Sequence, residues 1–107
     1  MWSISFFKSS RGERLVKEFI EVQPILTQAK ITHLLSLLEI YGLAVGPPYV
    51  KKIARDLFEI RVTGNLQIRI FFTIRKHTIY LLHGFIKKTQ KIPTKELSIA
   101  LRRLVLV

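Results

Sequence analysis

The chain has 107 residues, 49% of them hydrophobic, and it contains no cysteine. This length predicts one domain with a modest core, and the lack of cysteine excludes disulfides and thiolate metal sites. The formal net charge of +11 favours a polyanionic partner: nucleic acid first, an acidic protein second and an anionic membrane surface third. The alternative is a basic surface that is merely solvated. We see no signal-peptide pattern and no apolar run near the roughly 20 residues of a membrane helix, so we expect a cytoplasmic protein.

The positive charge is concentrated in the second half of the chain. Residues 1–50 carry five basic and four acidic side chains, whereas residues 51–107 carry thirteen basic and three acidic ones. A field of one sign attracts polyanions and costs some stability by self-repulsion. The segregation therefore favours a functional basic surface over a merely solvated one.

The first half of the sequence predicts a strand and a helical hairpin. Residues 2–7 alternate their apolar side chains, which predicts a short strand. A first helix follows and ends near Val22, before Pro24. A second helix is predicted from Thr27 to Tyr41, because its leucines and isoleucines recur at helical spacing. We interpret residues 43–55, with their glycines and prolines, as an irregular connection.

The second half predicts three consecutive strands and a final helix. The strands are expected at residues 56–62, 66–74 and 78–86, with turns at 63–65 and 75–77. A C-terminal helix follows Pro93, with Thr94 as its candidate cap. The order is β-α-α-β-β-β-α, a single α+β domain over residues 1–107. We expect an antiparallel sheet with the helical hairpin on one face and an open, basic second face.

The alternation of apolar and polar side chains predicts the register of the three strands, if both turns have three residues. The pairs expected on the covered face are Ile60–Ile68, Phe58–Ile70, Ile70–Leu82 and Phe72–Tyr80, and those on the open face are Glu59–Arg69 and Arg69–His83. This register predicts a cationic cluster centred on Arg69, with Arg61 and Phe71 nearby. Lys87, Lys88 and Lys91 follow the third strand and would form the rim of the cluster.

Several segments resemble the RelE/ParE superfamily of bacterial toxins, and are most similar to its phage-derived, HigB-like branch. The segments are LFEIR, QIRIFF, IYLLHGFIKKTQKIPTKEL and ALRR. The likeness covers about residues 47–103, and HGFIKKTQKIP is its most specific part. The first half agrees with the family only in the order of its elements. The turn Arg75-Lys76-His77 departs from the family, which often has Asp-Gly-Asn-like residues there.

The resemblance implies an activity and a partner. RelE-like toxins cut mRNA, mostly on the ribosome, with the RNA 2′-OH as nucleophile, whereas ParE-like relatives inhibit DNA gyrase. An antitoxin encoded beside the toxin holds it inactive. Arg69 falls on the central-strand arginine of the family motif, and Arg61 on the basic residue that ends the first strand of the hairpin. Lys87 and Lys88 fall on the basic pair after the last strand, and Lys91 follows them.

These roles have chemical grounds and structural alternatives. Arg69 can grip phosphate bidentately and stabilise the charge that develops on it, or it can simply pair with Glu59. Lys87, Lys88 and Lys91 can grip neighbouring phosphates or lower one another's pKa values, or they can form a solvated loop. For Arg61, the sequence supports a role in RNA binding and the absence of a functional role equally.

The groups that would move protons and stack on bases are also candidates with alternatives. Glu59 and His83 can transfer protons, although Glu59 could only orient Arg69 and His83 could be a satisfied histidine within the sheet. Phe71 could stack on a base or pack in the core. The histidines lack metal-ligand spacing, so we expect no metal and no cofactor.

Three functions follow from these observations. The first is a toxin that cleaves mRNA as a metal-independent, ribosome-dependent endoribonuclease. The second is a ParE-type gyrase inhibitor without nuclease activity, and the third a non-catalytic RNA- or ribosome-binding domain. For a toxin, we expect an antitoxin of helix-turn-helix type that presents acidic or helical segments to the basic open face or its rim.

Overall fold

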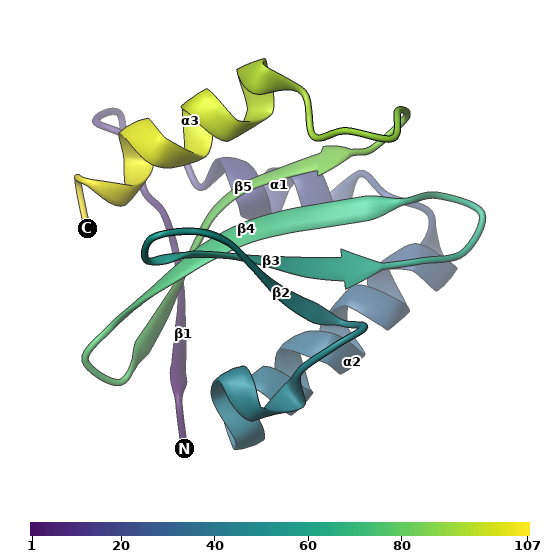
Figure 1. Ribbon diagram of the computed structural model, residues 1–107, viewed down its shortest axis with the longest axis horizontal. Helices are drawn as coiled ribbons and strands as arrows, with labels where there is room; N and C mark the ends of the chain where they lie inside the picture. The colour runs from purple at the N-terminus through teal and green to yellow at the C-terminus, as the bar shows by residue number, and fades with distance from the viewer.

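The computed structural model describes residues 1–107 and contains three α-helices and a five-stranded sheet (Figure 1). The helices are α1 (Leu15–Glu21), α2 (Ile25–Tyr41) and α3 (Thr94–Leu104), with the 3-10 helix η1 (Gly42–Val45) after α2. The strands are β1 (Ser3–Phe6), β2 (Val50–Ala54), β3 (Leu57–Val62), β4 (Ile68–Arg75) and β5 (Thr78–Ile86). The α+β class expected from the sequence is confirmed. None of the helices has the length and apolar character that crossing a membrane requires.

The sheet is mixed and has one more strand than the sequence predicts. Its order is β1-β5-β4-β3-β2, with β1 parallel to β5 and the other pairs antiparallel. The additional strand is β2, which lies within the segment that we interpreted as irregular. Pro47 and Pro48 precede this strand and do not interrupt it, so Val50 pairs with Ile60 and is buried. Because β2 is an edge strand, one of its sides needs no partner.

The turn between β3 and β4 is longer than predicted. Five residues, 63–67, connect the strands, so Ile60 lies opposite Ile70 and Arg61 lies opposite Arg69. The predicted pairing of Glu59 with Arg69 is therefore wrong by two residues. A shift of two keeps every side chain on its predicted face, because side chains alternate with a period of two. The apolar pattern alone could not distinguish the two registers.

The second hairpin departs from prediction in two places. Its turn has two residues, with Lys76 at a positive φ of 55°, and Arg75 lies opposite Thr78. A β-bulge then inserts Leu82 between the pairs Phe72–Leu81 and Phe71–His83. Arg69 consequently faces Phe85 and not His83. Tyr80 lies on the α3 side of the sheet, where it packs against the second core, and not on the face covered by α1 and α2.

Two apolar cores lie on the two faces of the sheet. The first joins α1 and α2 to the sheet; its helical members are Val16, Ile20, Ile31, Leu34 and Leu38. The second joins α3 to the other face and is built on Leu57, Phe71, Leu82, Phe85 and Ala100. We predicted that the second face would be open. It is only partly open, because α3 covers part of it. Burying one leucine or phenylalanine side chain contributes about 1.5–3 kcal/mol. By covering such side chains of the strands, α3 stabilises the sheet.

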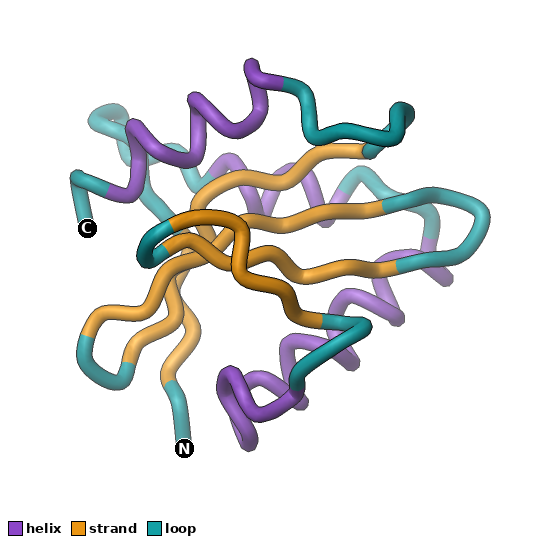
Figure 2. The backbone as a smooth tube through the Cα atoms, in the orientation of Figure 1, coloured by secondary structure: helices purple, strands orange, loops and turns teal.

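The turn between β3 and β4 lies at the same end of the sheet as the connection from β5 to α3 (Figure 2). The backbone N–H of Lys87 donates to the carbonyl of Gln67 at 2.7 Å and ties the two segments together. The lysines of the β5–α3 connection are thus placed beside the start of β4.

Candidate functional site

Three charged side chains on β3 and β4 form what we call the arginine cluster: Glu59, Arg61 and Arg69. They share the α3 side of the sheet because they occupy alternate positions on antiparallel strands. Arg61 Nε donates to Glu59 Oε1 at 2.6 Å. The same carboxylate oxygen lies 3.5 Å from Arg69 Nε. One carboxylate therefore holds two guanidinium groups on one surface.

The cluster is buried at one side and accessible at the other. The side chains of Glu59 and Arg69 are 1% and 8% exposed, whereas that of Arg61 is 29% exposed. Burial lowers the pKa of Arg69; Glu59 opposes this shift, and the neighbouring Arg61 adds to it. An arginine remains protonated at neutral pH even so. Two positive charges thus face one negative charge, and the cluster keeps a net attraction for anions.

The hydrogen-bonding capacity of the cluster is incompletely used. Arg69 donates through one terminal nitrogen to the carbonyl of Ile68 at 3.0 Å, but its buried Nε has no hydrogen-bond partner. The second oxygen of the Glu59 carboxylate, Oε2, is also buried without a partner. Buried polar groups are nearly always paired, and exceptions occur at functional sites. The Arg69 Nε therefore faces the Glu59 carboxylate through charge attraction without a formed hydrogen bond.

Lys51 is a cation near the cluster that sequence analysis missed. It lies on β2 directly opposite Glu59, so its exposed side chain lies on the same face of the sheet. The signal for it was the VKKIA segment, which was assigned to a loop because of the prolines before it. Recognising β2 would have added this lysine to the predicted cluster.

The three predicted rim lysines follow the end of β5, as expected. Lys87 is half-buried and continues the ladder beside Gln67, two pairs along from Arg69–Phe85 and so on the same face. Diagonal neighbours of this kind lie about 7–8 Å apart. Lys88 and Lys91 are exposed. The basic surface thus continues from the arginine cluster into the β5–α3 connection.

His83 lies farther along the same face than predicted. It pairs across the strands with Phe71, and its ring stacks on that of Phe85 with centroids 5.9 Å apart. His83 Nε2 lies 2.8 Å from Glu96 Oε1 at the start of α3. Burial lowers the pKa of His83, and the hydrogen bond and charge of Glu96 oppose that shift. Phe85 therefore separates the imidazole from the arginine cluster.

The tautomer of His83 follows from its partner. A carboxylate only accepts hydrogen bonds, so the Nε2 atom facing Glu96 carries the hydrogen, and in the neutral ring Nδ1 keeps its lone pair. Glu96 was not predicted as a site residue, because no sequence pattern connects α3 to β5. Its position three residues after Pro93 indicated only the first turn of a helix.

Phe71 is not available to stack on a base. Its side chain is fully buried beneath α3, where it contacts the ring of Phe85 with centroids 5.3 Å apart. The RNA-stacking role predicted for Phe71 is therefore withdrawn. Its alternation with polar residues placed it on the correct face, but α3 covers that face at this point.

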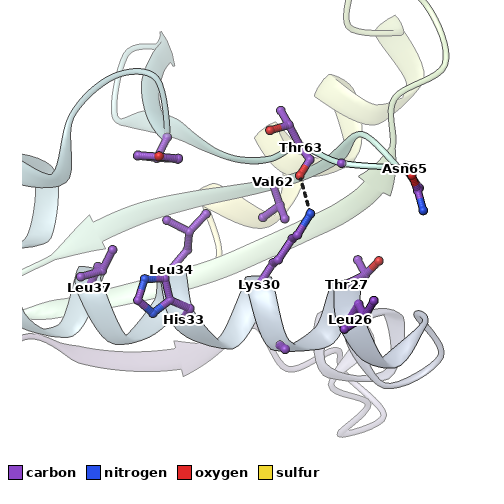
Figure 3. Close-up of a pocket in the computed structure, with 12 residues that line it drawn as sticks. Leu26, Thr27, Lys30, His33, Leu34, Leu37, Val62, Thr63 and Asn65 are labelled. Atoms are coloured by element: carbon purple, nitrogen blue, oxygen red, sulfur yellow. Dashed lines mark hydrogen bonds between the residues drawn. The ribbon is translucent and has the colours of Figure 1, made fainter.

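A cavity of the molecule lies away from the arginine cluster. It has a volume of about 710 Å³ and lies between α2 and the turn between β3 and β4 (Figure 3). Leu34 and Val62, which line it, belong to the first core. The cavity therefore opens on the α1–α2 side of the sheet and not on the side that carries the arginines.

Comparison with known proteins gives one match. Residues 18–105, most of the chain, match the family model described as phage-derived protein Gp49-like (DUF891). The matched region includes α2, all of β2–β5 and α3. A search of curated proteins found no match.

Proposed function

The chain belongs to the phage-derived Gp49-like family, a RelE-like family of toxins from toxin–antitoxin systems, and on this premise we propose that it is an mRNA endoribonuclease. In this proposal residues 1–107 act as one RelE-like toxin domain in the cytoplasm, and an antitoxin is its cognate partner. The segment HGFIKKTQKIP supports placing the chain in the HigB-like branch of these toxins. The substrate is mRNA, most effectively on the ribosome, and no metal takes part.

The arginine cluster is the observation that carries the proposal. Cleavage by the 2′-OH forms a bond from the 2′-oxygen to phosphorus and breaks the bond from phosphorus to the 5′-oxygen. Negative charge increases on the non-bridging oxygens of the phosphate as this happens. Arg61 at the accessible side and Arg69 behind it present guanidinium donors on one surface, which suits those oxygens. Glu59 keeps both guanidinium groups in place.

His83 is the better of the two proton-transfer candidates. Glu59 is fully buried and its Oε1 is already bonded to Arg61, which supports an orienting role. His83 has a neutral, unpaired Nδ1 and a carboxylate that fixes its ring. In the proposed reaction Nδ1 takes the proton of the 2′-OH, and the departing 5′-oxygen takes a proton from water. Lys87, Lys88 and Lys91 bind neighbouring phosphates, and Lys51 adds to the field.

The experiment compares Arg69→Ala with Arg75→Ala. Arg75 lies on the same strand, bonded to Thr73, outside the cluster. Translating ribosomes with a defined mRNA are incubated with each purified protein, and cleavage is followed by primer extension. We expect Arg69→Ala to lose about 100-fold or more in rate, the effect of removing one charge-stabilising donor, and Arg75→Ala to cleave normally.

The outcomes separate the proposed activity from its alternatives. Circular dichroism first establishes that both variants are folded. Full activity of folded Arg69→Ala would show that the cluster is not the catalytic centre. Intact mRNA together with broken DNA in cells that express the wild-type chain would identify a gyrase inhibitor instead. Salt-dependent RNA binding without cleavage or toxicity would leave a simple binding domain.

A further inference from the structure

α2 exposes large apolar side chains at its N-terminal end and buries others along its length. Ile31, Leu34 and Leu38 pack into the first core. On the outside, Ile25 and Leu26 are 77% and 78% exposed. The apolar side chains of a surface helix normally face the core, so the first turn of α2 lacks the cover that its composition calls for.

Most of the exposed large apolar side chains lie in and around this helix. Seven of the eleven large apolar side chains that are exposed in the molecule lie between residues 22 and 49: Val22, Ile25, Leu26, Ile40, Tyr41, Leu43 and Tyr49. Scattered exposed apolar residues are ordinary, but a concentration of them in one region marks an interaction surface.

The cavity of about 710 Å³ described above forms a groove beside α2, between this helix and the turn that follows β3. We call it the α2 groove; it includes Leu26, Lys30, His33 and Leu37 from α2, with Tyr49 and Asn65 opposite. Figure 3 shows Leu26, Lys30, His33 and Leu37 successively along the helix. α2 has 17 residues, which corresponds to a length of about 25 Å, enough to support a second helix beside it.

Lys30 determines the charge that the groove accepts. Its ammonium group donates to the carbonyl of Thr63 at 3.2 Å (Figure 3), and no carboxylate of the chain forms an ion pair with it. An ammonium group has three donors, so most of its hydrogen-bonding capacity is free. An apolar groove with one uncompensated cation at its centre is complementary to an apolar segment that carries a carboxylate.

We propose that the α2 groove binds an acidic amphipathic helix of the antitoxin. The apolar side of that helix would cover Leu26 and its neighbours, in the manner of a helix bound in a hydrophobic groove, and a carboxylate would pair with Lys30. The inference rests on the toxin–antitoxin function proposed above. It places the partner on the side of the sheet opposite the arginine cluster, whereas charge alone would favour the basic face.

A synthetic peptide provides the probe. It has the length of α2, leucines at helical i, i+3, i+4 and i+7 spacing, and glutamates elsewhere; a scrambled peptide of the same composition is the control. Binding to the whole chain is followed by fluorescence anisotropy. We expect Leu26→Asp and Lys30→Glu each to weaken binding by about tenfold or more, as loss of an anchoring contact does.

Two control variants test the alternatives. Val105, directly after α3, is 75% exposed, so Val105→Asp matches Leu26→Asp in chemistry and exposure at another surface. Lys88→Glu removes charge from the basic face at an exposed position. Both variants should bind the peptide as the wild-type chain does. A peptide with one central glutamate changed to lysine should bind Lys30→Glu better than it binds the wild-type chain.

Several results would overturn the inference. Equal binding of the scrambled peptide would show general attraction to a basic protein, and loss of binding in Lys88→Glu but not in Lys30→Glu would move the helix to the basic face. Sedimentation of a dimer that Leu26→Asp converts to a monomer would assign the groove to a second copy of this chain. RNA cleavage by Leu26→Asp, measured without peptide, tests the nuclease separately and should be unchanged.

Discussion

Arg61 and Arg69 lie directly opposite each other on adjacent strands, an arrangement in which like charges ordinarily destabilise a sheet. Glu59 offsets this repulsion, because its Oε1 lies 2.6 Å from Arg61 Nε and 3.5 Å from Arg69 Nε. The three side chains therefore behave as one unit. Changing any of them alters the electrostatic environment of the other two.

Replacing Glu59 by glutamine should destabilise the fold strongly. The change leaves Arg69, almost entirely buried, without its counter-ion and facing Arg61. Removing one partner of a buried ion pair costs about 3–5 kcal/mol, so we expect a loss near the lower end because Arg61 is partly exposed. Urea denaturation measures the change. Glu18→Gln, at an exposed site on α1, is the matched control and should change stability by less than about 0.5 kcal/mol.

Arg102 and Arg103 are adjacent on α3 but should differ in their importance for stability. Arg103 donates to the carbonyl of Leu82 at 2.8 Å, and its guanidinium lies 5.3 Å from the ring centroid of Phe7. Leu82 is the bulge residue, so its carbonyl has no regular place in the ladder. Arg103→Ala should cost about 1–3 kcal/mol in thermal or urea unfolding, whereas exposed Arg102→Ala should cost almost nothing. Equal effects would contradict this assignment.

His83 should make the protein less stable in mildly acidic solution. Its pKa in the folded chain lies below the ordinary value of 6.5, chiefly because of burial. The unfolded chain therefore binds a proton more readily between the folded and unfolded pKa values, and stability is lost as pH falls below about 6.5. Urea unfolding at about pH 7.5, 6.5 and 5.5 should show that loss. His83→Gln should reduce it, and an unchanged pH dependence would assign the effect to other groups.

The lysines after β5 should set the salt dependence of RNA binding. Lys88 and Lys91 are exposed and carry the basic surface beyond the sheet. Each phosphate contact on a single strand contributes about 0.7 to the slope of log K against log salt concentration. Lys88→Gln and Lys91→Gln should each reduce the slope by about that amount in a filter-binding titration, and Lys17→Gln on α1 should not. A slope that Lys17→Gln reduces equally would indicate diffuse binding.

Pattern and propensity were sufficient for the element types other than β2 and for the faces of β3 and β4. They were insufficient where geometry depends on loops. The register of β3 against β4 is set by a five-residue turn in which Leu66 packs against the first core, and a period of two cannot show a shift of two. Leu82 changes the alternation of β5 within an unbroken apolar run, so the sequence gives no sign of the bulge.

The two arginines of the predicted site lie on one surface, as expected, but the residues around them differ from the prediction. Arg61 and Arg69 share a surface because alternation places them there, and Glu59 joins them through a diagonal contact and not through the predicted opposite pairing. The contact of His83 with Glu96 depends on how α3 crosses the sheet, which is a tertiary relationship that local patterns do not contain. The same helix buries Phe71.

The parallel pairing of β1 with β5 joins the first strand of the chain to the last. Ser3 lies opposite Thr78, so completing this edge closes a loop that includes both hairpin helices and three other strands. The strands β2 to β5, by contrast, are consecutive antiparallel neighbours. Contacts that are local in sequence form faster than distant ones, so the hairpin that carries the arginines is expected to form early and β1 to dock late. The order of synthesis and the order of folding would then run in opposite directions along this sheet.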